Sequence, residues 1–278
     1  MDVNCIKMPY TPGWHYIPNV FPRSAAFHAP LPKGKRFIVA EPIEIAAQSH
    51  YTLKQHAGEQ LDQGDLDILL GVTTKLAQLE AVGCATQGDF VSFQLSQLFY
   101  ACARTPGNYA SFLKHFERLS EAMFTASFKY FPDAGLSETP WSLIELINDG
   151  SWEIKVRVSN EYRKLFALEY TGICDDQRRQ LLPDGQWLHA FFSSHSKKRE
   201  VSPLEIGRLI GRSPDKALAI EPMLIKQFAK ISAVTGWECK LELGNASVMK
   251  KGKEKGYNSK TKKAQGSGAK SMAPDGEI

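Results

Sequence analysis

Residues 202–243 combine two helix starts and a closing strand, and read SPLEIGRLIGRSPDKALAIEPMLIKQFAKISAVTGWECKLEL. Ser202-Pro203-Leu204-Glu205 has the form of a capping box with proline at the first helical position, and Gly211 ends the predicted helix. Ser213-Pro214 predicts the start of a second helix. Apolar and polar residues then alternate over 237–243, as in a strand. Two helices joined by a tight turn and followed by a strand are typical of a winged helix-turn-helix unit.

The same order of elements is found once more, nearer the N-terminus. Apolar residues recur at helical spacing over 65–81, 95–102 and 109–123. The turn signal Asn148-Asp149-Gly150 precedes an alternating strand over 152–158. Two copies of one pattern, about a domain length apart, predict an α+β protein made of tandem winged-helix domains.

This pattern divides the chain into four predicted parts. We expect an irregular arm, rich in proline and aromatic residues, at 1–36, which packs onto a domain and is not helical. A first winged-helix domain follows at 37–158, and a second at 159–243 begins with a connecting helix over Ser159–Tyr170. Residues 244–278 hold eight lysines and three acidic residues among glycines and serines, which favours a disordered basic tail. Because the whole chain carries +4 and this tail +5, residues 1–243 carry −1.

Cysteine usage and hydropathy argue for a cytoplasmic protein. The five cysteines are scattered along the chain and are odd in number, so we expect neither a disulfide framework nor a zinc site. The N-terminus lacks a basic stretch followed by an apolar run, and no apolar stretch approaches the length of a membrane span. We therefore expect no membrane partner.

Several stretches resemble plasmid replication initiators of the TrfA/RepA type. Pro22-Arg23-Ser24-Ala25-Ala26-Phe27 is similar to the opening motif of that family, and Phe191-Phe192-Ser193-Ser194-His195 is similar to the segment that enters its second winged helix. Shorter similar stretches are 65–69, 108–122, Leu204-Glu205 and Leu209-Ile210-Gly211. The resemblance implies binding to short direct repeats (iterons) in double-stranded origin DNA, melting of neighbouring DNA, and recruitment of the host replicative helicase or initiator proteins. A homodimer is a further partner that it allows.

The candidate DNA-binding residues follow from the two predicted helix-turn-helix units. Ser213-Pro214 would place Arg212 and Lys216 in the first turn of the second recognition helix, the end that points into the major groove, with Pro222 interrupting this helix further on. The full candidate set is Arg212, Ser213, Lys216, Lys197, Lys198, Arg199, Asn108, Lys114 and Arg118. For the basic residues, an ordinary solvated surface is the alternative interpretation.

Motifs of catalysis are missing from the sequence. There is no G-x-x-x-x-G-K-[ST] phosphate loop, no G-x-S-x-G elbow, and no pair of histidines of the kind that holds a metal in DNA-nicking initiators. We expect no catalytic residue, metal or cofactor, and therefore no enzyme. Three other functions stay open: a transcriptional repressor with the same fold, a metal-dependent DNA nickase, and a protein-interaction module that does not bind DNA.

Overall fold

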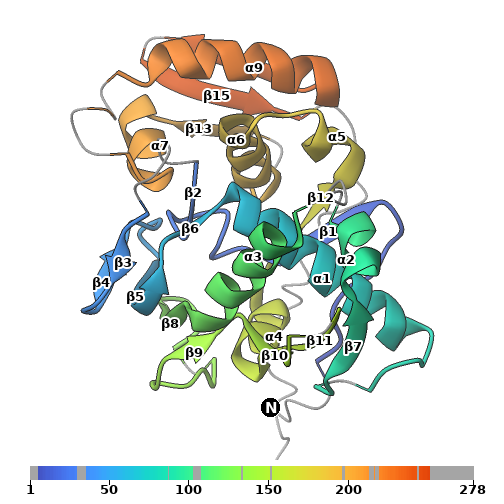
Figure 1. The fold of residues 1–278 in the computed structure, drawn as a ribbon. Helices are drawn as coiled ribbons and strands as arrows, with labels where there is room; N and C mark the ends of the chain where they lie inside the picture. The colour runs from blue at the N-terminus through green and yellow to red at the C-terminus, as the bar shows by residue number, and fades with distance from the viewer. Residues whose placement is uncertain are drawn as a thin grey trace, which may run out of the picture.

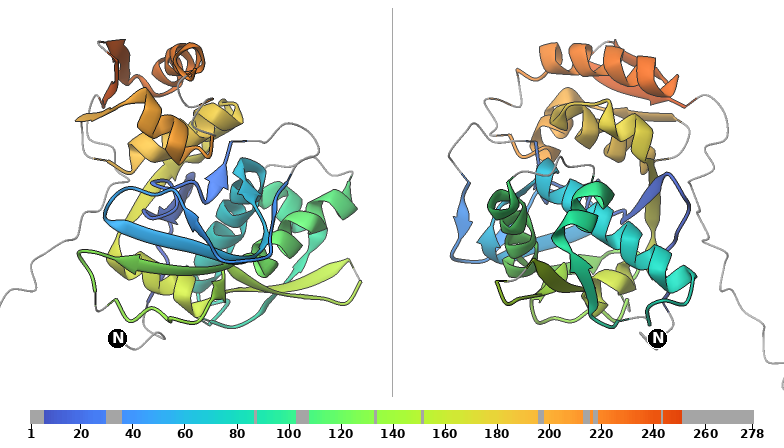
Figure 2. Two further views of the ribbon diagram at one scale, coloured as in Figure 1. Left: turned by 90° about the vertical axis from the view of Figure 1, so that its left-hand side faces the viewer. Right: turned by 45° about the vertical axis from the view of Figure 1, so that its right-hand side comes forward.

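The computed structural model describes residues 6–29, 36–86, 88–102, 108–132, 134–150, 152–195, 198–212, 216, 219–242 and 244–250. This part of the chain combines helices with several small sheets, which confirms the predicted α+β class. Its buried apolar residues form two separate clusters. We name the regions around them the N-terminal unit (residues 6–174) and the C-terminal unit (residues 181–250). In Figures 1 and 2 the C-terminal unit sits on one end of the larger N-terminal unit.

Three helices and a three-stranded sheet form the centre of the N-terminal unit. The helices are α1 (Gln63–Ala81), α2 (Leu95–Ala101) and α3 (Tyr109–Glu121). The antiparallel strands are β7 (Val91–Gln94), β10 (Ile144–Asn148) and β11 (Glu153–Val158), in the spatial order β10-β11-β7. The three helices and β11 lie within a few residues of their predicted ranges. Along the chain the order is therefore helix, strand, two helices and a hairpin.

The C-terminal unit repeats this arrangement. Its elements are α6 (Pro183–Ser193), β13 (Lys198–Val201), α7 (Pro203–Leu209), α9 (Glu221–Thr235), β14 (Glu238–Glu242) and β15 (Asn245–Met249). The sheet has the spatial order β13-β15-β14, so the second strand of the hairpin again lies beside the first strand of the unit. Both units thus share one order of elements along the chain and one order of strands in space.

Helix α7 begins and ends where the sequence predicts. The side chain of Ser202 accepts a hydrogen bond from the backbone N–H of Glu205 at 3.2 Å, and Pro203 occupies the first turn. Gly211 follows the end of the helix with φ of 81°, a conformation that residues with a side chain seldom adopt. A β-carbon at Gly211 would also come within 1.6 Å of the imidazole of His28, so a side chain here would have to displace that ring.

A second sheet of the N-terminal unit was not predicted as such. It contains β3 (Ile38–Val39), β4 (Ile43–Ile45), β5 (Tyr51–Glu59), β8 (Met123–Phe128) and β9 (Trp141–Ser142). Strands β8 and β9 are inserted between α3 and the β10–β11 hairpin. Along β5, Tyr51, Leu53 and Gln55 are buried while the residues between them face solvent, as expected for a strand with one covered face.

Residues 6–29 of the predicted arm pack onto the N-terminal unit as expected, but they form strands instead of an irregular segment. Strand β1 (Trp14–Pro18) pairs antiparallel with β12 (Tyr170–Cys174), and β2 (Phe27–His28) pairs with β6 (Leu61–Asp62). The segment between β1 and β2 also buries Phe21 completely. This proline- and aromatic-rich segment therefore forms short strands and core contacts, because it pairs with strands far along the chain.

The predicted connecting helix also lies within the N-terminal unit. It is α4 (Asn160–Leu168), whose Tyr162, Leu165 and Phe166 are part of the N-terminal core. The boundary predicted at Val158 is therefore too early, and α5 (Asp175–Arg179) precedes the C-terminal unit instead. No sheet in the described part of the chain contains strands of both units.

Strand β15 corrects the prediction that the tail begins at residue 244. Ala246 and Val248 are 0% and 2% exposed, and both belong to the C-terminal core. The ammonium group of Lys250 donates to the backbone oxygens of Ser193 and His195 at 3.0 Å each. Residues 245–249 therefore form a strand, although they fall in the predicted tail. The rest of that predicted tail, 251–278, lies outside the described part of the chain. None of the described helices is both long and apolar enough to cross a membrane.

Candidate nucleic-acid interface

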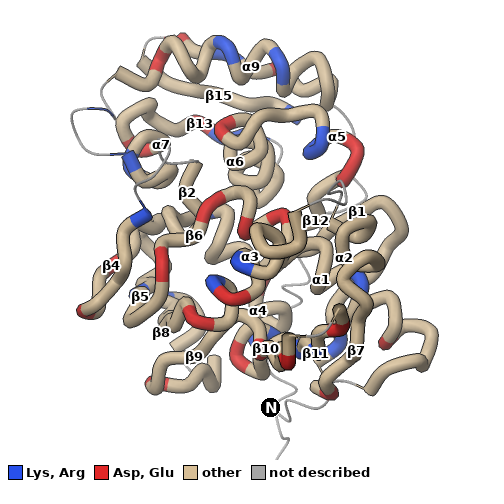
Figure 3. Tube along the Cα trace, in the orientation of Figure 1, with Lys and Arg blue, Asp and Glu red and all other residues tan. Residues whose placement is uncertain are grey.

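Helix α9 lies at the end of the molecule away from the N-terminal unit and presents one side to solvent. Leu224, Phe228 and Ile231 are buried in the C-terminal core. On the opposite side, Ile225 is 61% exposed, and Lys226 is exposed beside it. Figure 3 shows that the two basic positions of α9 follow each other along the helix. Because the packing of this unit leaves the outer side of α9 uncovered, it is available to a partner.

The positive charge of this outer side is not neutralised by its neighbours. Neither Lys226 nor Lys230 forms an ion pair with any residue that the structure describes. By contrast, Lys240 in the adjacent hairpin pairs with Glu238 at 2.8 Å and lies 3.9 Å from Glu242. Within this unit, helix α9 therefore carries accessible positive charge beside an exposed aliphatic side chain.

The predicted start of the second recognition helix differs from the observed start of α9. Helix α9 begins at Glu221 with Pro222 in its first turn. Proline has no backbone N–H and a fixed φ, so it is tolerated in the first turn of a helix, where that N–H would lack a partner. Pro222 therefore begins the helix, and the prediction that it interrupts one is wrong.

This shift separates Arg212 and Lys216 from the first turn of α9. Arg212 follows α7, and its guanidinium lies 3.4 Å from the carboxylate of Asp184 on α6, so it is turned toward the body of the unit. Lys216 is exposed. Ser213 lies outside the described residues, as does Lys197.

Strand β13 carries two further predicted residues on the C-terminal unit. Lys198 and Arg199 are both exposed, and Lys198 pairs with Glu200 at 2.6 Å. Since β13 pairs only with β15, it forms one edge of its sheet. The two side chains can therefore reach a partner at this edge, with the charge of Lys198 partly offset.

The predicted residues of the N-terminal unit take three different roles. Asn108 caps α3 by accepting from the backbone N–H of Ser111 at 2.9 Å. Lys114 is exposed on α3. Arg118 points inward instead, and donates from Nε and Nη2 to one carboxylate oxygen of Asp65 at 2.9 and 2.7 Å. Of these three, only Lys114 offers a charge that no described residue neutralises.

Asp65 organises a buried cluster that joins the start of α1 to α3. Its side chain is 0% exposed, and it accepts from His115 at 2.7 Å and from Arg36 at 2.8 Å in addition to Arg118. It also accepts from the backbone N–H of Asp62, which completes a capping box. Burial alone would raise the pKa of Asp65, but the hydrogen bonds from His115 and Arg118 and the arginine charges hold it well below its usual range. The cluster therefore positions α3.

The sequence contains a signal for the outer side of α9. Apolar residues at 224, 228 and 231 place 225, 226 and 229 on the opposite side of any helix through this segment. The predicted helix start at Ser213-Pro214 lies outside the described residues, and Lys216 just after it is helical. Among the described residues, no three histidine, cysteine, aspartate or glutamate side chains are grouped so that they could hold a metal ion.

No protein-family model and no curated protein sequence matches the chain. Solved structures do match. Domains 2 and 3 of RctB align over 84% of this chain and 97% of theirs, with a TM-score of 0.52 and 10% identity. The Pi initiator protein in complex with iteron DNA aligns over 66% of this chain and 91% of its own, with a TM-score of 0.45 and 13% identity. The chain therefore shares the overall fold of RctB domains 2 and 3.

Proposed function

We propose that this protein is a plasmid-type replication initiator, which binds repeated origin sequences in double-stranded DNA through two winged-helix units and recruits the host replicative helicase or initiator proteins. The observation that carries the proposal is the repeated arrangement of helix, strand, two helices and hairpin, with the same strand order in both units. In winged-helix proteins the second of the two adjacent helices is the one that reads DNA. That helix is α9 in the C-terminal unit, and its outer side is free.

The chemistry of α9 suits a major groove. An α-helix fits the width of this groove, where thymine presents a methyl group and guanine presents two acceptors. Ile225 and Ala229 can contact thymine methyl groups, and Lys226 and Lys230 can donate to guanine or to phosphates. Lys114, Lys198 and Arg199 are candidates for phosphate contacts on either side. Together these contacts would read the base sequence and bind the phosphate backbone.

The charge balance supports sequence-dependent binding. Residues 251–278 hold seven lysines and three acidic residues, so residues 1–250 carry no net charge. A neutral body gains little from the general attraction between basic proteins and DNA. Its affinity would therefore come from local positive charge and from base contacts, as expected for a protein that recognises a repeated site.

A test compares variants of α9 on cognate and random DNA. The cognate duplex is a direct repeat from the DNA that flanks the gene, and the random duplex has equal length. Since one good base contact is worth about 1–3 kcal/mol, we expect Lys226→Ala with Lys230→Ala to weaken binding to the repeat at least tenfold and to reduce its preference over random DNA. Lys54→Ala is the control, because Lys54 is also an exposed lysine but lies on β5 of the N-terminal unit.

The same preparation separates the other functions. A wild-type chain that binds the repeat no better than random DNA would contradict the proposal. Nicking of a supercoiled plasmid in the presence of Mg²⁺ or Mn²⁺ would identify a nickase instead. Specific binding without support for replication of a plasmid that carries the repeats would identify a repressor.

A further inference from the structure

The two sequence stretches that resemble initiator motifs meet at the boundary between the units. Arg23 lies in the first stretch and Ser194 in the second, 171 positions further along the chain. The guanidinium of Arg23 donates from Nε to the hydroxyl of Ser194 at 3.0 Å and from Nη2 to the backbone oxygen of the same residue. The Arg23 side chain is only 9% exposed. A buried arginine of the N-terminal unit is thus bonded twice to one residue of the C-terminal unit.

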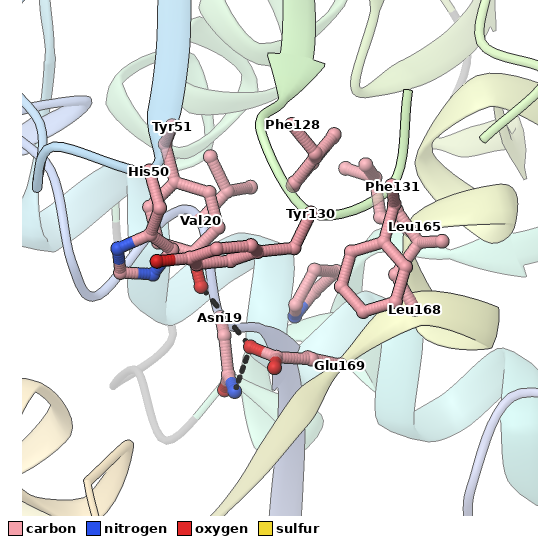
Figure 4. A pocket seen from close by; sticks show the side chains of 11 residues that line it. Asn19, Val20, His50, Tyr51, Phe128, Tyr130, Phe131, Leu165, Leu168 and Glu169 are labelled. Carbon is pink, nitrogen blue, oxygen red and sulfur yellow. Dashed lines mark hydrogen bonds between the residues drawn. The ribbon is translucent and has the colours of Figure 1, made fainter. Parts of the chain in front are cut away.

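The N-terminal unit holds the other end of this guanidinium. Nη1 of Arg23 donates to the hydroxyl of Tyr51 at 2.8 Å and to Oε2 of Glu169 at 3.2 Å. Oε2 of Glu169 also accepts from Tyr51 at 3.1 Å and from Asn19 at 3.2 Å. Figure 4 shows Tyr51 and Asn19 directed at Glu169 beside a small pocket of about 20 Å³. Two other segments of the N-terminal unit, through Tyr51 and Glu169, therefore fix the position of Arg23.

On the other side, Arg23 contacts the C-terminal end of α6. The last carbonyl groups of a helix lack partners within the helix and carry its partial negative charge. Here the carbonyl of Ser194 accepts from Arg23, while those of Ser193 and His195 accept from Lys250. Arg23 is therefore the positively charged group of the N-terminal unit that binds the C-terminal end of α6.

Other contacts across this boundary are also directional and polar. Gln48 and the imidazole of His195 lie within hydrogen-bond distance, with Nε2 of both residues 3.1 Å apart, and Arg208 donates to the backbone oxygen of Ala47 at 2.8 Å. Most buried apolar residues cluster within their own unit, and among the described residues only Ala190 of α6 joins the core of the other unit. Units without a large apolar interface move relative to each other unless specific bonds hold them. A planar guanidinium with several fixed donors suits that purpose better than any other side chain.

We infer that Arg23 is a positioning residue that fixes the orientation of the C-terminal unit relative to the N-terminal unit, so that the two units read DNA at one spacing and one helical phase. This inference rests on the proposed function. Without Arg23 each unit keeps its own core, but the angle between the units is no longer set. The consequence is a change in how binding depends on DNA spacing, and not only in its strength.

The test measures that dependence with the full chain. The probe is the duplex that the wild-type chain recovers most strongly from a pool of random duplexes of about 30 base pairs, roughly three helical turns. A second duplex carries two extra base pairs between its two protected segments, which rotates them by roughly 70°. We expect the insertion to weaken wild-type binding at least tenfold. We expect Arg23→Met to bind the original duplex more weakly and to lose less than about threefold on insertion, since freely oriented units adapt to the new phase.

The ratio of the two affinities distinguishes positioning from general destabilisation. A variant that is only less folded loses active protein equally on both duplexes, so its ratio stays that of the wild type. Arg163→Met is the matched control: Arg163 is also buried and pairs with Glu80, but both residues belong to the N-terminal unit. Its ratio should equal that of the wild type. Ser194→Ala removes one acceptor of Arg23 and should give an intermediate ratio, which keeps the test usable if Arg23→Met does not fold.

Small-angle X-ray scattering of the free chain gives a readout that needs no DNA. Arg23→Met should show a larger maximum dimension than the wild type, whereas Arg163→Met should not. Wild-type insertion ratios in both Arg23→Met and Ser194→Ala would overturn the inference. A wild-type chain that recovers no duplex would contradict the proposed function instead, and the inference would then be overturned by unchanged scattering of Arg23→Met.

Discussion

Buried charges in this protein are matched by partners from distant segments. Asp65 pairs with Arg36, His115 and Arg118, and Glu80 pairs with Arg163. A buried ion pair adds little net stability, because both charges lose hydration, but removal of one partner leaves the other unpaired in a medium of low dielectric constant. Such residues therefore have large mutational effects on stability.

We expect Asp65→Asn to lower the free energy of unfolding by about 3–5 kcal/mol, because Arg118 and Arg36 then lose a buried carboxylate. Urea denaturation measures this loss. Because the pKa of Asp65 is lowered in the folded state, its contribution is fully present above the ordinary carboxyl pKa of about 4 and is lost as the pH falls toward the folded value. The difference between the two proteins should thus be constant from neutral pH down to about 5 and shrink only in stronger acid. Glu117→Gln on the exposed side of α3 should change stability by less than about 0.5 kcal/mol.

The buried histidines predict a loss of stability in mild acid. Burial lowers the pKa of His189 to about 3, helped by Arg178 and Lys250, and burial with Arg23 lowers that of His195 to about 3. The unfolded chain binds these protons near pH 6.5, so stability rises with pH between the two values. From pH 6.5 downward we expect each histidine to cost about 1.4 kcal/mol per pH unit.

Chemical denaturation at pH 7 and at pH 5 measures this dependence. His195→Gln should reduce the difference between the two pH values, since glutamine does not titrate. An equal difference in wild type and variant would show that His195 does not contribute.

At the scale of elements, β15 shows how a short segment depends on its surroundings. The five residues of β15 include only two buried side chains, yet the strand lies between β13 and β14 and pairs with both. Without it the other two strands have no common neighbour. The last strand of a sheet in sequence is thus the central strand in space.

Two truncations test the role of β15. A chain that ends at Leu243 should lose the folded C-terminal unit, because it lacks the central strand and two core residues. A chain that ends at Lys250 keeps every described contact of that unit and should retain the wild-type melting temperature. Circular dichroism and thermal melts distinguish the two. Equal melting temperatures for both truncations would show that β15 does not stabilise the unit.

At the scale of the whole molecule, the excess positive charge lies beyond the two units and not within them. Residues 1–250 have no net charge, and the remaining 28 residues carry all of the excess. If the units bind a defined DNA site, the basic terminus adds attraction that is independent of sequence. This attraction should depend strongly on salt.

Comparison of the full chain with the chain ending at Lys250 measures that contribution. The slope of log Kd against log salt changes by about 0.9 for each phosphate contact that is lost. We expect a shallower slope for the shorter chain and little change in its preference for the repeat over random DNA. Fluorescence anisotropy between 50 and 200 mM salt, the range in which such contacts dominate, gives both quantities. An unchanged slope would show that the lysines beyond Lys250 do not contact phosphates.

Local sequence determined the order and type of most elements. Apolar spacing predicted α1, α2 and α3, the turn signal predicted the β10–β11 hairpin, and the capping sequence at Ser202 predicted the start of α7. Each of these signals depends on residues within one or two turns of each other, so neighbouring side chains suffice to express it. The α+β class follows from the same signals.

Only the tertiary structure decided what depends on partners far along the chain. The N-terminal arm became strands because β12 and β6 pair with it, and β15 became a strand because two others flank it. Arg118 points inward because Asp65, 53 positions earlier, accepts two hydrogen bonds from it. Arg23 is buried because Ser194 and Glu169 lie against it. Pairing and burial at such separations depend on where the whole chain places both partners, and no local pattern contains that information.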